Sequence, residues 1–212
     1  GGFGGGFGFN RGAPSYLAAP GRYTARLTIT DANGQSFVRT QSFELLKDGE
    51  QMLSQAQLEA LDAFRLEVVR FQKALSDAQA RADSASKRVA EVKKTTDANS
   101  AKVPAAVAAD VKRANDVVAG FAKAIGMPGA PRRPPNEMDD EAQPPQDATF
   151  SQRAGTLGSV LSSTFAVSGA QRATLAQLKK ELASQAAAID RLRATDIPTL
   201  TKALQAAGVN VP

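Results

Sequence analysis

The feature that most constrains the fold is a heptad pattern of apolar residues between residues 61 and 92. Apolar side chains recur there at alternating intervals of three and four residues. This spacing is typical of a coiled-coil-like helix whose apolar seam packs against other helices. Charged residues such as Arg65 and Arg70 occupy positions off the seam, so we expect the other faces of this helix to be in water. The seam consists of Leu61, Phe64, Val68, Phe71, Leu75, Ala78, Ala82, Ala85, Val89 and Val92.

The pattern around the heptads predicts where helices begin and end. The long helix should start after Ser54, a candidate N-cap with Gln57 at the capping-box position, and end near residue 97. A second helix should follow Pro104 and end at Gly126. Further helices are predicted over residues 150–167, from about 170 to 196, and over 199–207. The expected fold is mainly α: an antiparallel helical bundle of about four helices, preceded by a glycine-rich arm and a β-hairpin.

A β-hairpin is predicted before the helices. Residues 22–30 alternate between polar and apolar, Asn33-Gly34 supplies turn chemistry, and residues 35–46 return as a second strand. Tyr23, Ala25, Leu27 and Ile29 share one face of the first strand, and Phe37, Phe43 and Leu45 have a shared parity in the second. An isolated two-stranded hairpin is marginally stable in water. It must therefore pack on the helices, on strands from elsewhere, or on a partner.

Composition argues against an enzyme. The chain of 212 residues contains no histidine and no cysteine. It therefore lacks the commonest general base, the commonest metal ligand and any disulfide. The net charge of +5 comes from interspersed basic and acidic residues, which is typical of a solvated surface rather than a nucleic-acid interface. No apolar run approaches the roughly 20 residues that span a bilayer. We expect no catalytic site, no cofactor and no transmembrane segment.

Two low-complexity segments are the candidate partner-binding sites. Phe3, Phe7 and Phe9 stand in a glycine run that has little reason to order on itself, so we expect these rings to need a surface elsewhere. A proline-rich acidic loop, residues 127–149, is long enough to be functional or disordered. Its acidic run at 139–141 lacks the alternation and the glycine of a calcium loop, so no metal site is expected. The predicted partner-binding residues are Phe3, Phe7, Phe9, Arg132, Arg133, Asp139 and Asp140.

These observations divide the chain into five segments. The first, a glycine- and phenylalanine-rich arm without an initiator methionine, suggests a processed piece of a longer product. The segments are the arm at 1–15, the β-hairpin at 16–48, a long helical hairpin at 49–126, the proline-rich loop at 127–149, and C-terminal helices that complete the bundle at 150–212.

Two stretches resemble one known family. Residues 17–28, LAAPGRYTARLT, resemble the LAAPGxYTVxLT end of an immunoglobulin-like or fibronectin-like module. Residues 192–208, LRATDIPTLTKALQAAG, are similar to the terminal LxATDLPALNxALRAAGL of the same proteins. These are bacterial sortilin-like, BNR-repeat β-propeller proteins of the glycosyl hydrolase type. The resemblance implies that residues 16–48 are the remnant of a sandwich, and that the chain is the family's helical C-terminal region. It covers no part of the propeller, so it carries over no catalytic residue.

Two functional hypotheses follow. The first is a non-catalytic structural module, a processed C-terminal fragment that serves as an extracytoplasmic scaffold or clamp subunit. It would hold other protein chains of a larger assembly, for example a respiratory or photosynthetic complex on a membrane face. The alternative is an accessory C-terminal domain of an exported propeller enzyme that processes glycosides. The resemblance implies a periplasmic or extracellular location for both.

Overall fold

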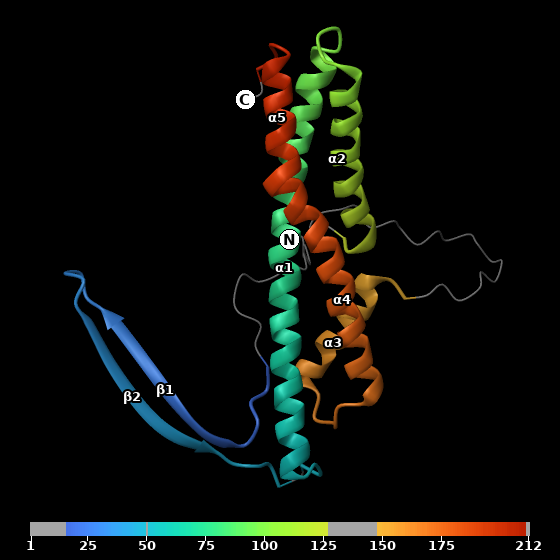
Figure 1. The fold of residues 1–212 in the computed structure, drawn as a ribbon. Coiled ribbons are helices and arrows are strands. Elements are labelled where there is room, and N and C mark those ends of the chain that lie inside the picture. Colours follow the sequence, from blue (N-terminus) through green and yellow to red (C-terminus); the bar gives the residue numbers. More distant parts are fainter. Residues whose placement is uncertain (1–15, 50, 127–147, 211–212) are drawn as a thin grey trace, which may run out of the picture. The chain divides into compact units, whose positions relative to one another are not determined.

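A computed structural model describes residues 16–49, 51–126 and 148–210 (Figure 1). Helices hold 66% of the described residues, and a two-stranded antiparallel hairpin precedes them, which confirms a mainly helical class with a hairpin. The elements in order are β1 (Gly21–Thr30), β2 (Ser36–Leu45), α1 (Gln55–Ala98), α2 (Ala105–Ala124), α3 (Phe150–Gly158), the 3-10 turn η1 (Ser159–Ser162), α4 (Gly169–Arg191), the π-helical turn η2 (Leu192–Asp196) and α5 (Ile197–Ala206).

The chain separates into two compact units, and each is described by itself. Among the described residues, unit 1 contains residues 16–49, 51–69 and 158–169, and unit 2 contains residues 70–126, 148–157 and 170–210. Helix α1 therefore contributes its first turns to unit 1 and its remaining turns to unit 2.

Helix α1 begins where the sequence predicts. The backbone N–H of Ser54 donates to Gln57 Oε1 at 2.9 Å, and the backbone N–H of Gln57 donates to Ser54 Oγ at 3.3 Å. This reciprocal pair is a capping box, which satisfies backbone donors that the first helical turn leaves without intrahelical partners.

The predicted seam of α1 is core. All of its residues except the partly exposed Leu75 are buried. In unit 2, the ring centroids of Phe71 and of Phe150 in α3 are 6.2 Å apart, and the two rings are tilted relative to each other. Fully burying a side chain of this kind contributes about 1.5–3 kcal/mol, so the seam is a principal source of stability.

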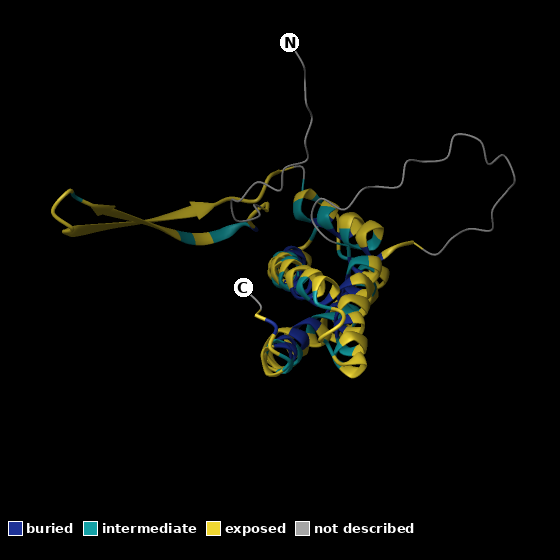
Figure 2. Ribbon diagram, turned by 90° about the horizontal axis from the view of Figure 1, so that it is seen from above, coloured by how far each residue is buried: buried dark blue, intermediate teal, exposed yellow. Residues whose placement is uncertain are grey.

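The helices of unit 2 bury their apolar stripes toward one another, and their outer faces are exposed (Figure 2). Polar contacts join helices that are distant in sequence. Arg81 of α1 pairs with Asp190 of α4 at 3.0 Å, and Arg153 of α3 pairs with Glu181 of α4 at 2.7 Å. The buried residues of the later helices are Val111, Ala114, Val118, Phe121, Phe150, Leu157, Leu175, Leu178, Leu182, Ile189, Leu192, Ile197, Leu200 and Leu204.

The sequence predicts that the Asp196-Ile197-Pro198 stretch ends or kinks α4, but the chain there remains helical. Pro198 lacks the N–H that would bond to the carbonyl of residue 194 in an α-helix. Turn η2 widens to π-helical geometry immediately before this proline, and α5 continues from Ile197. Gly208, at φ +73°, closes the final helix as predicted.

The prediction of a helix over residues 150–167 is wrong at its C-terminal end. Helix α3 ends at Gly158, and η1 ends at Ser162. Ser163 is already extended, at φ −70° and ψ 142°. The glycines and serines of this segment have low helix propensity, so an apolar spacing alone does not carry the helix further. Phe165, an apolar residue within the predicted helix, is 78% exposed.

Candidate interaction surface

The register of the hairpin sorts its side chains onto two different faces. Tyr23 pairs with Phe43, Leu27 with Arg39, and Ile29 with Phe37. These pairs lie on one face, called here the apolar face, because residues of the same parity point the same way. Its members are Tyr23, Ala25, Leu27, Ile29, Phe37, Arg39, Gln41, Phe43 and Leu45.

The opposite face is polar. Thr24 and Ser42 are paired across the strands with hydroxyl oxygens 3.2 Å apart, and the hydroxyls of Thr30 and Ser36 are 3.1 Å apart. Such an alternation is typical of a sheet with one face on a core and the other in water.

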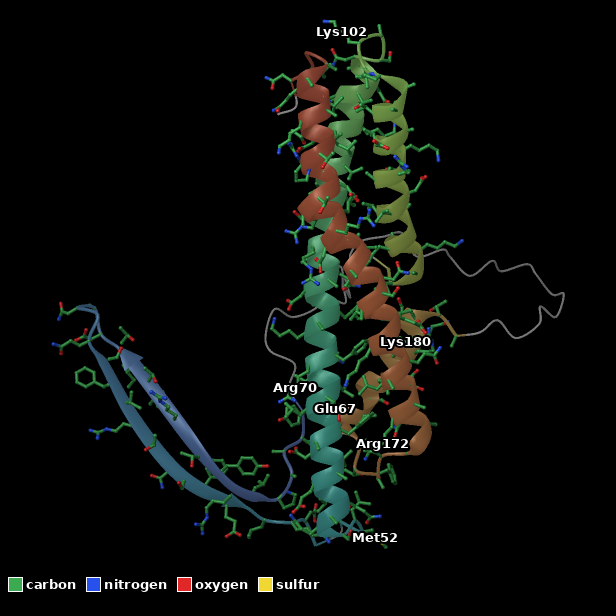
Figure 3. All side chains as sticks on the ribbon, in the orientation of Figure 1. Met52, Glu67, Arg70, Lys102, Arg172 and Lys180 are labelled. Carbon is green, nitrogen blue, oxygen red and sulfur yellow. The ribbon has the colours of Figure 1, made fainter. Side chains whose placement is uncertain are left out.

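Most residues of the hairpin, including those of the apolar face, are exposed to solvent (Figure 2). Leu27, Ile29, Phe37 and Phe43 are each about half exposed, at 57%, 52%, 57% and 49%. Side chains project from both strands of the ribbon (Figure 3). Contiguous apolar patches of this kind mark interaction surfaces in soluble proteins. The sequence required the hairpin to pack against something, and the structure leaves this face open.

Both strands also have an open edge among the described residues. Each strand is ten residues long, and each pairs only with the other. The register runs without a bulge from Gly21–Leu45 to Thr30–Ser36, and neither strand contains a proline. Natural sheets usually protect long edges with bulges, prolines or covering elements. The hairpin therefore offers both an apolar face and two rows of backbone donors and acceptors.

The turn that sets this register is built by Asp31. Its Oδ1 accepts from the backbone N–H groups of Asn33 at 2.9 Å and Gln35 at 2.8 Å. Gly34 takes the positive φ, +81°, while Asn33 does not. Because the turn fixes the register, it also fixes which side chains share the apolar face.

The root of the hairpin is held by Tyr23. Its hydroxyl donates to the carbonyl of Ala19 at 2.5 Å, and its ring stacks on Phe43 with centroids 5.9 Å apart. Burial, followed by the negative charge of Asp62 and by Tyr16, raises the pKa of the Tyr23 phenol above its usual value. The phenol therefore stays protonated and remains a donor across the physiological pH range.

A second anchor is Arg65, and here the sequence prediction of a solvated side chain is wrong. Arg65 is only 4% exposed. Its guanidinium donates to the carbonyls of Leu17 at 2.6 Å, Val160 at 3.3 Å and Ser163. A guanidinium has five donors in a rigid fork, so one side chain can satisfy several carbonyls. Arg65 thus joins α1 to the segment before β1 and to the end of η1, where the backbone N–H of Leu17 also donates to Leu161 at 3.1 Å.

The electrostatics around Arg65 follow from its burial. Burial lowers the pKa of Arg65, while Asp62 and Tyr16 act in the opposite direction. Asp62 Oδ1 is buried without a hydrogen-bond partner among the described residues. The carboxylate therefore stabilises the buried cation through its charge. The heptad pattern gave no signal that Arg65 is buried. Arg65 directly follows the seam residue Phe64, and the residue beside a narrow apolar stripe usually lies in water.

The seven residues predicted to bind partners (Phe3, Phe7, Phe9, Arg132, Arg133, Asp139 and Asp140) all lie outside the described residues. In the described ranges, no group of three or more acidic side chains is placed to hold a metal ion. Nor is any helix there long and apolar enough to cross a membrane.

Comparison with known proteins does not place the chain in a family. No protein-family model, no curated protein and no solved structure matches it significantly. Inferences about its function therefore rest on its own residues and on the resemblance noted above.

Proposed function

We propose that this chain is a non-catalytic structural module that binds other protein chains, with the hairpin's apolar face as its principal contact surface. The observation that carries this proposal is the exposure of that face, with Phe37 and Leu27 both 57% exposed. Half-burying a large apolar side chain contributes on the order of 1 kcal/mol, so covering five or six of them supplies several kcal/mol. That amount is enough to offset part of the cost of association.

The helices provide the scaffold in this proposal. We propose that they form an antiparallel bundle of about four helices, supported by the buried heptad seam and by the ion pairs between α1, α3 and α4. Arg65 and Tyr23 hold the segment that leads into β1, through the carbonyls of Leu17 and Ala19. The phenylalanines of the arm and the charged residues of the proline-rich loop would add contacts to the same assembly.

The biological setting is proposed from the family resemblance. A C-terminal region of an exported propeller protein would work in the periplasm or outside the cell, as a scaffold or clamp subunit. The alternative, an accessory domain still attached to a glycoside-processing propeller, is favoured by the open strand edges, which suit pairing with further strands of one polypeptide. Intact-mass measurement of native material separates the two. A species near 22.1 kDa supports the separate subunit, and a much larger one supports the attached domain.

The binding proposal is tested by photo-crosslinking in the cells that make the protein. A photoreactive phenylalanine derivative replaces Phe37 on the apolar face, or Val38 on the opposite face as the matched control. Val38 is 45% exposed, so both positions are accessible. We expect a discrete adduct from position 37 and none from position 38. The proposal fails if position 37 yields no adduct, or if both positions yield the same adducts.

A further inference from the structure

We propose that Asn33, in the turn of the hairpin, is a site of spontaneous covalent modification that converts it to aspartate and isoaspartate with loss of ammonia. The same local sequence occurs at the end of α1, where the structure protects the corresponding asparagine. This inference goes beyond the proposed function and does not depend on it, because it concerns the chemistry of the turn alone.

The sequence Thr-Asp-Ala-Asn occurs twice in the chain. Residues 30–33 form the first copy, which Gly34 follows, and residues 96–99 form the second, which Ser100 follows. The first copy lies in the turn between β1 and β2, and the second spans the end of α1. The two copies therefore place the same residues before an asparagine in two different structures.

Asn33 and Gly34 are suited to forming a succinimide. The backbone nitrogen of Gly34 loses its proton to water and attacks Cγ of Asn33, and the side-chain nitrogen leaves as ammonia. Water then adds to either carbonyl of the ring and breaks its bond to the ring nitrogen, which gives aspartate or isoaspartate without any oxidant or reductant. Glycine has no side chain beside the attacking nitrogen, and a Cβ built at Gly34 would meet no atom within 4 Å. The approach to Asn33 Cγ is therefore open.

The turn leaves the side chain of Asn33 available for this reaction. Asn33 is exposed, and its amide group makes no hydrogen bond to any residue that the structure describes. The backbone N–H of Gly34 donates to the carbonyl of Asp31 at 3.0 Å, so the turn must open before this nitrogen can react. A two-stranded hairpin is marginally stable, and exposed turns open at a low cost in free energy. Local opening therefore supplies the reactive form.

The second asparagine, Asn99, is held in place. Its Nδ2 donates to the carbonyl of Thr95 at 2.9 Å, which engages the group that would have to leave. Its own carbonyl accepts from the backbone N–H groups of Lys102 at 2.9 Å and Val103 at 3.2 Å. Asn99 is also partly buried, and the side chain of Ser100 lies beside the nitrogen that would attack. We therefore expect Asn99 to react much more slowly than Asn33.

The modification changes the turn that fixes the hairpin register. Oδ1 of Asp31 accepts from the backbone N–H groups of Asn33 and Gln35, and the N–H of Asp31 donates to the carbonyl of Gln35 at 2.9 Å. Isoaspartate adds a methylene group to the main chain inside this closed turn. Both products also add a negative charge close to the carboxylate of Asp31, which repels it. The modified hairpin should therefore open more often than the original one.

The test is incubation of the full chain at mildly alkaline pH, followed by tryptic peptide mapping. Residues 27–39 and residues 95–102 form the two tryptic peptides that contain Asn33 and Asn99. Conversion raises the mass of a peptide by about 1 Da, and chromatography separates its aspartate and isoaspartate forms. We expect peptide 27–39 to convert at least about ten-fold faster than peptide 95–102. Mildly acidic pH should slow the reaction, because the attacking nitrogen then keeps its proton.

Two variants separate the effect of the structure from that of the sequence. Ser100→Gly makes the five residues at 30–34 and 96–100 identical, so any remaining difference in rate comes from the structure. Asn33→Gln keeps the backbone N–H that bonds to Asp31, but its side chain would have to form a larger ring. It should remove the mass change from peptide 27–39.

Several results would overturn the inference. It fails if peptide 27–39 keeps its mass, if Asn33→Gln changes mass as fast as the wild type, or if the two sites convert equally in folded Ser100→Gly. In urea the two sites of that variant should convert at equal rates, and a persistent difference would also contradict a structural cause. Finally, amides of residues 36–45 should exchange faster in the purified isoaspartate form, and unchanged exchange would refute the effect on the hairpin.

Discussion

Replacement of Arg65 by methionine tests whether one buried cation holds the root of the hairpin to α1. The side chain is 4% exposed, and its guanidinium donates to the carbonyls of Leu17, Val160 and Ser163. Methionine keeps much of the volume and removes every donor. The substitution therefore leaves three carbonyls to find water or remain unsatisfied.

The magnitude follows from two opposing terms. A buried acceptor that loses its partner costs about 1–3 kcal/mol. The contacts to Leu17 and Ser163 are partly buried, so water can replace some of that loss. Removing a buried charge also returns part of its desolvation cost. We therefore predict a net loss of about 2–3 kcal/mol in the free energy of unfolding.

The assay is urea unfolding followed by circular dichroism, with Arg70→Met as the matched control. Arg70 lies on the same helix and is exposed, so its replacement should change stability by less than about 0.5 kcal/mol. Amide exchange at Leu17 should also accelerate in Arg65→Met, because its N–H bonds to Leu161 beside the anchored carbonyls. Equal stabilities for the two variants would refute the anchor.

Three further predictions concern the helices. Phe71→Ala should lower the free energy of unfolding by about 3–5 kcal/mol, because the Phe71 side chain is only 3% exposed. Phe165→Ala should lower it by less than about 0.5 kcal/mol, because Phe165 is 78% exposed. A loss below about 1 kcal/mol for Phe71→Ala would show that Phe71 is not a core residue. Ser54→Ala should cost about 0.5–2 kcal/mol by removing the capping box, and an unchanged melting temperature would contradict that role. Hydrogen bonding to Arg153 lowers the pKa of Glu181, so this pair stabilises the fold above pH 4.5 and is lost as pH falls through the lowered pKa. Glu181→Gln should therefore lose less stability than the wild type between neutral and acidic pH, and parallel pH profiles would contradict the pairing.

Local patterns allowed the helices to be predicted well. The three–four spacing located the buried seam from Leu61 to Val92, and Ser54 with Gln57 located the start of α1. Both signals act within a few residues of the chain, where spacing and capping chemistry determine the outcome. The alternation in residues 22–30 and 35–46 likewise predicted the two faces of the hairpin.

Contacts between distant segments could not be predicted. Arg65 is buried because the carbonyls of residues 17, 160 and 163 converge on it, and no spacing in the sequence encodes that meeting. The exposure of Phe165 was not predicted for a different reason. The apolar spacing suggested a helix through this residue, but the glycines and serines of the segment do not sustain one. The residues predicted to bind partners lie outside the described ranges, so that prediction stands for later test.

The most direct measurement is hydrogen exchange of residues 36–45, compared between the isolated chain and the assembly recovered from cells that produce it. If the apolar face is the contact surface, these amides should exchange rapidly in the isolated chain, since a two-stranded hairpin is marginal alone. They should exchange at least about ten-fold more slowly in the assembly, because a partner covers the face and pairs an edge. Amides of residues 105–124 in α2 serve as the internal reference and should be unchanged. Identical exchange of residues 36–45 in the two samples, or recovery of the chain only as a free monomer, would contradict the account.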